Sequence, residues 1–558
     1  MGRFSLRFNK MIAPISRRQF VATGATLAVS TLAPKRLFAT TVSGTQRVVI
    51  RADSEIGIVR PEFHGHFIEH LGSCVYGGLW VGKNSHIPNL NGYRKQAVEY
   101  LQALGVPVLR WPGGCFADDY HWRDGIGPRE KRPKRVNIHW GGYVEDGSFG
   151  THEFIGLCRL LKAQPYLAGN VGSSTPHELR DWIEYCNYPS GSTLSDERGA
   201  NGSPEPLRVR YWGVGNESWG CGGNMRPEEY ARLYRDFAVY CREFGGTELF
   251  LVASGPSGND SRWSRGLMDG LGWERPQGMS MHYYSGGHDR STTFAVDHMN
   301  EQLSSYGKVE EAIVHQRAVL DSYKKGKEIG LILDEWGVWD NIPAEDEKQY
   351  GKLWQQSTMR SALAAGLGLN IFNRLADKLY MCNIAQMVNV LQSLLLTDGP
   401  EGERCVRTTT YHAFSLFKPH RAKTAVRVES DDSSPLGLSV SASKDAKELV
   451  VSWVNPRHDA DLQVECMLKG ADLSVGSAQI LHDAEWNACN SFDAPDRVVP
   501  KLLTLRVEGS KILLDLPRLS VATAVLPIRS ASLQRLRTMV AVARINKSSC
   551  AFLFEGLL

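Results

Sequence analysis

The sequence lacks three features that would assign it to common classes of protein. Its 11 cysteines include no C-x-x-C pair, the spacing that places two thiolates on one structural zinc ion. Beyond the N-terminus, no run approaches the ~20 apolar residues that a membrane-spanning helix needs. A strong charge excess is also absent, because the net charge is only +4 over 558 residues. We therefore expect no structural metal, no membrane association of the mature protein and no nucleic-acid partner.

The composition is that of an ordinary globular protein. Apolar residues make up 42% of the chain and charged residues 22%, which is typical of folded domains. A chain of 558 residues is too long for one hydrophobic core, so two folded domains with tails are expected. The 14 Trp residues suit sugar binding, because sugar rings stack on aromatic faces, although most Trp residues serve in cores.

Residues 1–39 predict an export signal. Basic residues precede the Ser-Arg-Arg run at 16–18, a modest apolar run covers 21–33, and Leu37-Phe38-Ala39 is suited to cleavage. The pattern resembles a twin-arginine signal peptide and predicts a periplasmic or extracellular protein. A basic N-terminus without a targeting role is the alternative. Since twin-arginine substrates fold before export, we expect mostly unpaired, buried thiols.

Residues 61–407 alternate between strand-like and helical runs. The helical pattern is clearest at 227–244, where Pro227 and two acidic residues favour a helix start. Eight strands are expected: Phe63–Ile68, Val106–Trp111, Pro165–Asn170, Val209–Asn216, Leu249–Ser254, Met279–Tyr284, Leu331–Trp336 and Asn370–Asn373. Eight such repeats predict a (β/α)₈ TIM barrel. A doubly wound open sheet would require a glycine-rich phosphate turn near the first strand, and none is present.

The flanking segments have a different pattern. Short alternating runs separated by turn residues fill 408–528 without helical spacing, which predicts a C-terminal antiparallel β-sandwich. Residues 40–60 alternate in the same way and are expected to add strands to that sandwich. Residues 529–558 form a C-terminal tail to which the sequence assigns no role.

Two glutamates follow apolar strands. Glu217 ends the fourth predicted strand and Glu335 the seventh, and the carboxyl ends of barrel strands meet on one face. Two carboxyl groups roughly 5 Å apart flank the scissile bond in a retaining glycosidase. The amide of Asn216 is suited to the sugar 2-hydroxyl, which favours Glu217 as acid/base and Glu335 as nucleophile. Most glutamates are solvated surface charges. A glutamate that follows a buried strand is less often of this kind.

Other polar side chains at the same strand ends are candidates for substrate binding. They are Glu69, Arg110, His282, Tyr284 and Gln386, and a pocket for a sugar requires such a density of donors and acceptors. Each has a structural alternative. Arg110 is also suited to pairing with a core carboxylate. His282 is also suited to a buried core position in which its hydrogen bonds are satisfied. Tyr284 is suited to packing or to holding the nucleophile by a hydrogen bond.

Five motifs stand in a specific order: Gly65-His66-Phe67-Ile68-Glu69-His70, Arg110-Trp111-Pro112-Gly113-Gly114, Gly150-Thr151-His152-Glu153-Phe154, Gly215-Asn216-Glu217 and Asp334-Glu335-Trp336. In this the chain resembles the α-L-arabinofuranosidases of glycoside hydrolase family 51 over residues 45–528. The resemblance implies a barrel with a jelly-roll-like sandwich. It also implies a retaining, exo-acting enzyme that removes terminal α-L-arabinofuranosyl groups from arabinan or arabinoxylan fragments.

The resemblance also implies roles for individual residues. Glu217 is the acid/base and Glu335 the nucleophile, and an arabinose subsite is lined by Glu69, Arg110, Asn216, Tyr284 and Gln386. It implies a homo-oligomer without metal or cofactor. Some members carry Asn after the Pro-Gly-Gly turn where this chain has Cys115, and a thiol is the poorer hydrogen-bonding group. A contact made there is expected to be weaker or bridged by water.

Two other functions are compatible with the same residues. A β-xylosidase or endoglucanase would keep the mechanism and change the sugar, because ring size is read by pocket shape. A sugar-binding barrel without activity is the third hypothesis, and the presence of both carboxylates argues against it.

Overall fold

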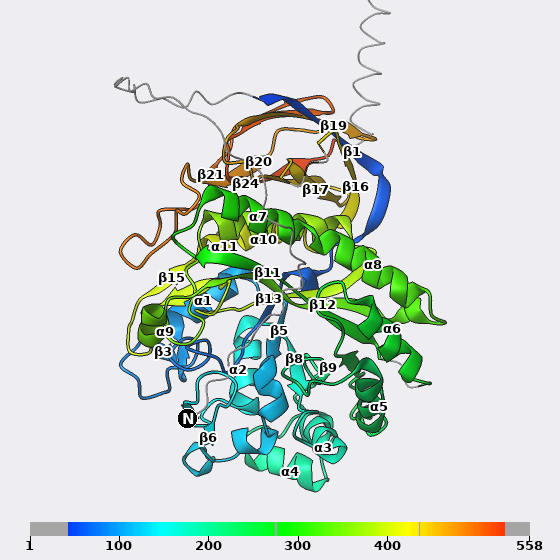
Figure 1. The fold of residues 1–558 in the computed structure, drawn as a ribbon, viewed down its shortest axis with the longest axis vertical. Helices are drawn as coiled ribbons and strands as arrows, with labels where there is room; N and C mark the ends of the chain where they lie inside the picture. The colour runs from blue at the N-terminus through cyan, green and yellow to red at the C-terminus, as the bar shows by residue number, and fades with distance from the viewer. Residues whose placement is uncertain (1–42, 274–275, 433, 435, 530–558) are drawn as a thin grey trace, which may run out of the picture. The chain divides into compact units, whose positions relative to one another are not determined.

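The computed structural model describes residues 43–529, except 274, 275, 433 and 435 (Figure 1). The predicted signal at 1–39 and the predicted tail, from residue 530 on, lie outside the described residues. Within the described part of the chain, every helix is too short or too polar to cross a bilayer.

Eight parallel strands close into a barrel, as the sequence predicts (Figure 1). In chain order they are β2 (Gly65–Phe67), β5 (Val108–Trp111), β8 (Gln164–Gly169), β9 (Tyr211–Val214), β10 (Phe250–Ala253), β11 (Gly278–Arg290), β12 (Gly330–Asn341) and β13 (Leu379–Ala385). Parallel pairing of β13 with β2 closes the ring, with Ile384 opposite His66. The carboxyl ends of all eight strands therefore meet at one mouth.

Helices follow the strands. They are α1 (Lys95–Leu104), α2 (Thr151–Leu161), α3 (Pro176–Asn187), α4 (Thr193–Ala200), α5 (Pro227–Ala238), α6 (Ser261–Gly270), α7 (Val296–Gly307), α8 (Val309–Asp321), α9 (Ala344–Tyr350), α10 (Met359–Arg374) and α11 (Thr409–Phe417). The predicted start of α5 is confirmed, because Pro227 occupies the first turn and the Glu229 carboxylate accepts a hydrogen bond from the Arg226 amide.

Short elements complete the barrel loops. Three hairpins pair β3 (Asn89–Leu90) with β4 (Tyr93–Arg94), β6 (Arg135–Val136) with β7 (Val144–Glu145), and β14 (Leu395–Thr397) with β15 (Cys405–Arg407). The 3₁₀ turns are η1 (Pro61–His64), η2 (Cys115–Asp119), η3 (Trp122–Gly125), η4 (Arg129–Lys131), η5 (Gly326–Glu328) and η6 (Lys418–His420).

The predicted eighth strand is wrong. Residues 370–373 form the last turn of α10, and the eighth strand is β13 instead. Helix α10 is buried on all sides, because it contacts β12 of the barrel and also β17, β18 and β24 of the C-terminal sheet. A helix buried all round has no polar face, so its final apolar run resembles a buried strand.

The second domain is one sheet of ten strands in the order β21-β20-β24-β18-β17-β16-β1-β19-β23-β22. Their bounds are β1 (Ser43–Ile58), β16 (Thr424–Ser430), β17 (Ser439–Lys444), β18 (Glu448–Asn455), β19 (Leu462–Lys469), β20 (Ser477–His482), β21 (Lys501–Leu502), β22 (Leu505–Glu508), β23 (Lys511–Leu516) and β24 (Ser520–Pro527). The N-terminal β1 lies between β16 and β19, antiparallel to the first and parallel to the second. Helix α11 precedes the first of the later strands, although no helix was expected after residue 408.

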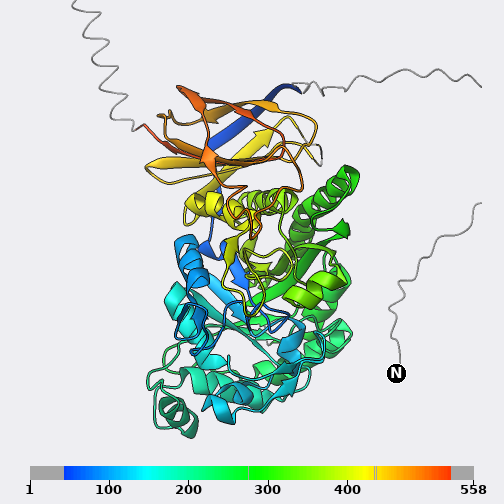
Figure 2. The same ribbon diagram turned by 90° about the vertical axis from the view of Figure 1, so that its left-hand side faces the viewer.

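The ten-stranded sheet folds over on itself (Figure 2). Trp453 of β18 donates a hydrogen bond from Nε1 to the Cys466 sulfur of β19 at 3.3 Å, although β17, β16 and β1 lie between these strands in the sheet. The two residues therefore face each other across a core and not along a sheet. This gives the layered packing of a β-sandwich.

Helix α10 fixes the sheet domain to the barrel. A Cβ atom added at Gly366 would lie 2.9 Å from Val454 Cγ2 and 3.2 Å from Val521 Cγ2, so the helix backbone approaches β18 and β24 closely. Asn370 adds a hydrogen bond from Nδ2 to the Ser439 carbonyl oxygen at 3.0 Å. The two domains therefore share one hydrophobic interface.

Trp453→Ala is expected to lower the free energy of unfolding by about 3–5 kcal/mol, because a fully buried Trp leaves a large cavity. Chemical denaturation followed by circular dichroism measures the change. Leu502→Ala is the control, since its side chain is 87% exposed and the substitution should alter stability by less than about 0.5 kcal/mol. Equal effects of the two variants would contradict the sandwich packing.

Candidate active site

Glu217 lies just beyond β9 in a sharply turned backbone. Its φ is +41°, a left-handed value that a residue with a side chain adopts only when its surroundings enforce it. The amides of Gly220 and Gly222 donate to the Glu217 carbonyl oxygen at 2.7 and 3.2 Å. The Ser218 amide donates to Ser254 Oγ at 3.2 Å. These bonds hold the turn and therefore the direction of the Glu217 side chain.

Glu335 lies within β12, and hydrogen bonds fix both of its oxygens. Arg110 donates from Nη1 to Oε1 at 2.7 Å, and the Tyr284 hydroxyl donates to Oε2 at 2.8 Å. Burial acts to raise the pKa of Glu335, but the charges of His282 and Arg110 outweigh it and hold the pKa below its usual value. Glu335 is therefore an oriented anion.

His282 joins the two glutamates. Its Nδ1 lies 2.9 Å from Glu217 Oε1 and 3.6 Å from Glu335 Oε2. One ligand atom from each of the three side chains lies within 4.8 Å of the others. Burial lowers the pKa of His282, yet the negative charges of Glu335 and Glu217 raise it above its usual value. The sequence placed these glutamates 118 positions apart, and the fold brings them face to face.

Arg110 makes the contact that the sequence offered as its structural alternative, a pairing with a core carboxylate. Besides Glu335, it donates from Nη2 to Asn216 Oδ1 at 2.5 Å, and its Nε lies 3.3 Å from the buried Asp334 carboxylate. It therefore pairs with a core carboxylate and also positions two residues of the site. Asp334 is fixed in turn by the Tyr166 hydroxyl, which donates to it at 2.9 Å.

Glu69 occupies a separate corner of the site. Its Oε1 accepts hydrogen bonds from the Phe116 amide and from Trp140 Nε1, and its Oε2 accepts one from Gln386 Nε2 at 3.1 Å. All three donors are neutral. Burial and then the negative charge of Glu335 raise the pKa of Glu69 to about 7. No sequence pattern points to Trp140, which lies between β6 and β7 outside any barrel strand.

These side chains surround a cavity of about 440 Å³. Of the predicted residues, Glu69, Glu217, His282, Tyr284, Glu335 and Gln386 line it, while Arg110 and Asn216 lie behind them. Trp219 and Trp339 also line it, which brings flat aromatic surfaces to a site of monosaccharide size. A Cβ atom at Gly114 would lie 2.9 Å from Glu335 Oε1, so a larger residue in the Pro-Gly-Gly turn would displace the Glu335 carboxylate.

Asp118 holds the turn that carries Asn216, and the sequence did not identify it. Its Oδ1 accepts hydrogen bonds from the amides of Val171 and Gly172 at 2.8 and 2.9 Å, and its Oδ2 accepts one from the Asn216 amide at 3.1 Å. Burial raises the pKa of Asp118 to about 7. Its only sequence signal is its place three residues after Cys115, in a turn that follows a barrel strand.

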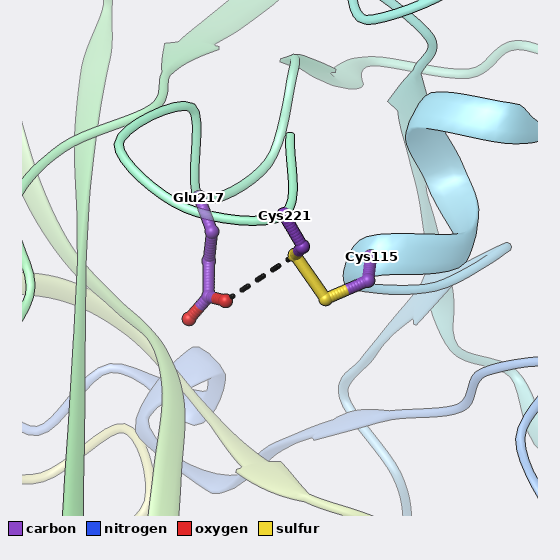
Figure 3. A group of neighbouring side chains, drawn as sticks. All are labelled: Cys115, Glu217 and Cys221. Carbon is purple, nitrogen blue, oxygen red and sulfur yellow. Dashed lines mark hydrogen bonds between the residues drawn. A yellow bond between two sulfur atoms is a disulfide. The ribbon is translucent and has the colours of Figure 1, made fainter. Parts of the chain in front are cut away.

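Cys115 and Cys221 form a disulfide (Figure 3). The prediction of unpaired thiols is wrong for these two, because η2 and the loop after β9 bring their Cα atoms to 5.5 Å, within the usual range for a disulfide. Cys74, Cys158 and Cys186 are buried thiols, as expected. The Cys115 prediction changes too, since a disulfide sulfur has no proton to donate to a ligand.

The fold and the site together define a class of enzyme. A closed (β/α)₈ barrel carries two facing carboxyl groups, one just after its fourth strand and one within its seventh, at the mouth of a sugar-sized cavity. This is the arrangement of a glycoside hydrolase.

Comparison with known proteins narrows the class. Residues 100–302 match the α-L-arabinofuranosidase 1 domain, and residues 334–520 match the α-L-arabinofuranosidase C-terminal domain. An intracellular exo-α-L-arabinofuranosidase of Bacteroides ovatus is 43% identical over 493 residues, which cover 85% of this chain and 94% of the relative.

Solved structures agree. The family 51 arabinofuranosidase of Xanthomonas axonopodis pv. citri is 39% identical with a TM-score of 0.83, covering 87% of this chain and 100% of that one. The α-L-arabinofuranosidase of Thermotoga maritima, solved with arabinose, is 27% identical with a TM-score of 0.77 and the same coverage. This chain belongs to the α-L-arabinofuranosidases of glycoside hydrolase family 51.

The same comparison corrects the predicted location. Export was predicted from residues 1–39, but the Bacteroides ovatus relative is an intracellular enzyme, which contradicts a periplasmic or extracellular protein. Two arginines before a modest apolar run are a short pattern and therefore weak evidence for export. The similarity to the intracellular relative covers 85% of this chain and is the stronger evidence.

Glu69→Gln should stabilise the protein increasingly as the pH rises. In the unfolded chain Glu69 loses its proton near pH 4.5, whereas in the folded protein it keeps it to about pH 7. Wild type therefore loses roughly 3 kcal/mol of stability across that interval on account of this carboxyl group, and the Gln variant does not. Urea unfolding of both proteins at pH 5 and pH 8 measures the difference, and an equal difference at the two values would contradict the raised pKa.

Proposed function

We propose that this chain is a retaining, exo-acting α-L-arabinofuranosidase in which Glu335 is the nucleophile and Glu217 the acid/base. The observation that carries the proposal is the close approach of the two carboxyl groups, whose facing atoms lie within 4.8 Å of each other and of His282 Nδ1 or Nε2. Retaining enzymes hold these groups roughly 5 Å apart, while inverting enzymes leave room for a water molecule.

In the first step, a Glu335 oxygen attacks the anomeric carbon while the bond from that carbon to the leaving oxygen breaks. Glu217 gives its proton to the leaving oxygen, so the aglycone departs as a neutral alcohol. The sugar is left as an ester on Glu335. Arg110 and Tyr284 hold the attacking carboxylate in one orientation, so little reorganisation is needed before attack.

In the second step, Glu217 acts as a base. It takes a proton from a water molecule, whose oxygen attacks the anomeric carbon and displaces the Glu335 carboxylate. Two inversions at one carbon give arabinose with its original configuration. His282, hydrogen-bonded to Glu217 Oε1, keeps the carboxyl group pointed at the same position in both steps.

Buried polar atoms support a sugar at this position. Asn216 Nδ2 and Gln386 Oε1 are buried and have no hydrogen-bond partner among the described residues. An unpaired buried polar atom is costly unless a ligand satisfies it. Asn216 Nδ2 is suited to donate a hydrogen bond to the 2-hydroxyl oxygen, and Gln386 Oε1 is suited to accept one from a second hydroxyl beside Glu69. A cavity of about 440 Å³ lined by these groups has room for a chain end, which favours exo action.

The relatives' names specify the sugar that is released, and the family resemblance implies the polymers that carry it. The fragments of arabinan and arabinoxylan that carry terminal α-L-arabinofuranosyl groups are the proposed substrates, and L-arabinose is the product. A homo-oligomer, as expected for the family, stays a prediction that light scattering can test. A β-xylosidase or endoglucanase is distinguished by a panel of aryl glycosides, on which the α-L-arabinofuranoside should be hydrolysed fastest.

Substitution of the two glutamates should give opposite azide products from an aryl α-L-arabinofuranoside. Glu335→Gly removes the nucleophile, so azide is expected to attack directly and yield the inverted glycosyl azide. Glu217→Ala keeps the ester intermediate, and azide should yield the retained product, with turnover of water falling about 10²–10⁴-fold. Nuclear magnetic resonance of the products distinguishes the two. Full activity in both variants would end the assignment, and exchanged stereochemistry would reverse the roles.

Tyr284→Phe should move the acid limb of the kcat/KM profile to higher pH. The phenol donates to Glu335 and helps to keep its pKa low, so without it the nucleophile is protonated at a higher pH. A lost hydrogen bond to a charged group predicts a fall in kcat/KM of roughly ten- to a hundredfold. Tyr283→Phe is the matched control, because its hydroxyl donates to the Ser305 carbonyl oxygen instead. An acid limb that shifts equally in both variants would contradict the role of Tyr284.

A further inference from the structure

The mechanism above makes no use of the disulfide beside Glu217. The Cys221 sulfur lies 3.6 Å from Glu217 Oε2 (Figure 3), and Cys115 lines the same cavity. A disulfide sulfur carries no hydrogen, so this contact is a hydrogen bond only when Glu217 is protonated. Two sulfur atoms therefore stand next to the group that must exchange a proton in every catalytic cycle.

We propose that reduction of this disulfide creates a binding site for a thiophilic divalent cation of the zinc type, formed by Cys115, Cys221 and Glu217. A phosphine supplies two electrons and takes the oxygen of a water molecule to become a phosphine oxide. The sulfur–sulfur bond breaks, and the two protons of that water make each sulfur a thiol. Zinc then binds as the two thiols release their protons. The bound ion occupies Glu217 and blocks the site reversibly.

The geometry suits zinc. One ligand atom from each of the three residues lies within 4.8 Å of the others. Zinc–sulfur bonds of about 2.3 Å and zinc–oxygen bonds of about 2.0 Å place tetrahedral ligand atoms roughly 3.5–3.8 Å apart. The distance from Cys221 sulfur to Glu217 Oε2 is already 3.6 Å. The two sulfurs must move apart from bonding distance, and reduction releases them to do so.

The two oxygens of Glu217 are divided between different partners. His282 Nδ1 lies 2.9 Å from Oε1, whereas the Cys221 sulfur is next to Oε2. Oε2 is therefore available to a metal while His282 orients the carboxylate from the other side. Hydrogen bonds of this kind to a ligating group strengthen metal sites. Water is expected to complete the coordination.

Reductant and ion can reach the pair. Neither cysteine is buried, in contrast to Cys74, Cys158 and Cys186. Burial raises the pKa of the Cys74 thiol to about 12, which keeps it protonated and a poor ligand at neutral pH. Zinc bound on reduction should therefore select Cys115 and Cys221 over the buried thiols.

Zinc binding to the full chain tests the proposal directly. One sample is reduced with a phosphine and desalted without oxygen, and another is left oxidised. Equilibrium dialysis against zinc chloride is expected to show about one more tightly bound ion per chain in the reduced sample. Reduced Cys221→Ser should lose that ion, and reduced Glu217→Gln should hold it more weakly. Cys489→Ser, which changes a half-buried thiol of the sheet domain, is the matched control and should retain it.

Activity gives a second readout that rests on the proposed function. Zinc should inhibit the reduced wild type on an aryl α-L-arabinofuranoside, compete with substrate and be reversed by a chelator. Each variant is compared with its own zinc-free rate. The oxidised wild type should resist the same zinc concentration.

Three results would overturn the proposal. The first is equal zinc binding by the oxidised and reduced proteins, which would show that the ion needs neither thiol. The second is no additional zinc in the reduced protein, and the third is additional zinc that survives in Cys221→Ser. A protein that binds zinc as expected but hydrolyses no arabinofuranoside would refute the proposed function and leave the metal site standing.

Discussion

The site depends on one buried cation. Arg110 contacts Asp334, Glu335 and Asn216, so a single guanidinium ties β5 to the ends of β9 and β12. Because burial alone would disfavour its charge, the neighbouring carboxylates are what keep the pKa of Arg110 above its usual value. Removal of the guanidinium, or of the carboxylates, would leave an uncompensated buried charge. That lowers stability more than the loss of the ion pair's own attraction does. The residue that orients the nucleophile is thus inseparable from the packing of the barrel.

Around that cation, three carboxyl groups share one cavity in different surroundings. Glu335 is contacted by Arg110, His282 and a phenol, which stabilise its anionic form. Glu69 receives only neutral donors and is exposed to the field of Glu335, so it keeps its proton to about pH 7. Neighbouring carboxyl groups with separated pKa values can do different tasks at one pH. A protonated Glu69 would offer a sugar hydroxyl a donor as well as an acceptor.

The sequence predicted the barrel, both glutamates and six neighbouring residues, because strand periodicity and strand-end motifs are local patterns. It failed where the deciding contact is distant in the chain. Residues 370–373 have the apolar pattern of a strand because α10 is covered by two domains at once. Trp140 and the pairing of Cys115 with Cys221 depend on how loops fold back over the mouth. The periodicity of a sequence does not predict contacts between distant loops. Asp118 accepts hydrogen bonds from backbone amides and belongs to none of the sequence motifs.

Helix α10 has a consequence for how such an enzyme could be divided. Its backbone touches valines of the sheet domain at Gly366, while its other side covers β12. A barrel truncated at residue 408 would expose the apolar face of α10 to water. It would also lose the packing that supports β12 from behind. The sheet domain is therefore part of the folded unit that supports the active site. We expect the barrel not to occur as a separate module.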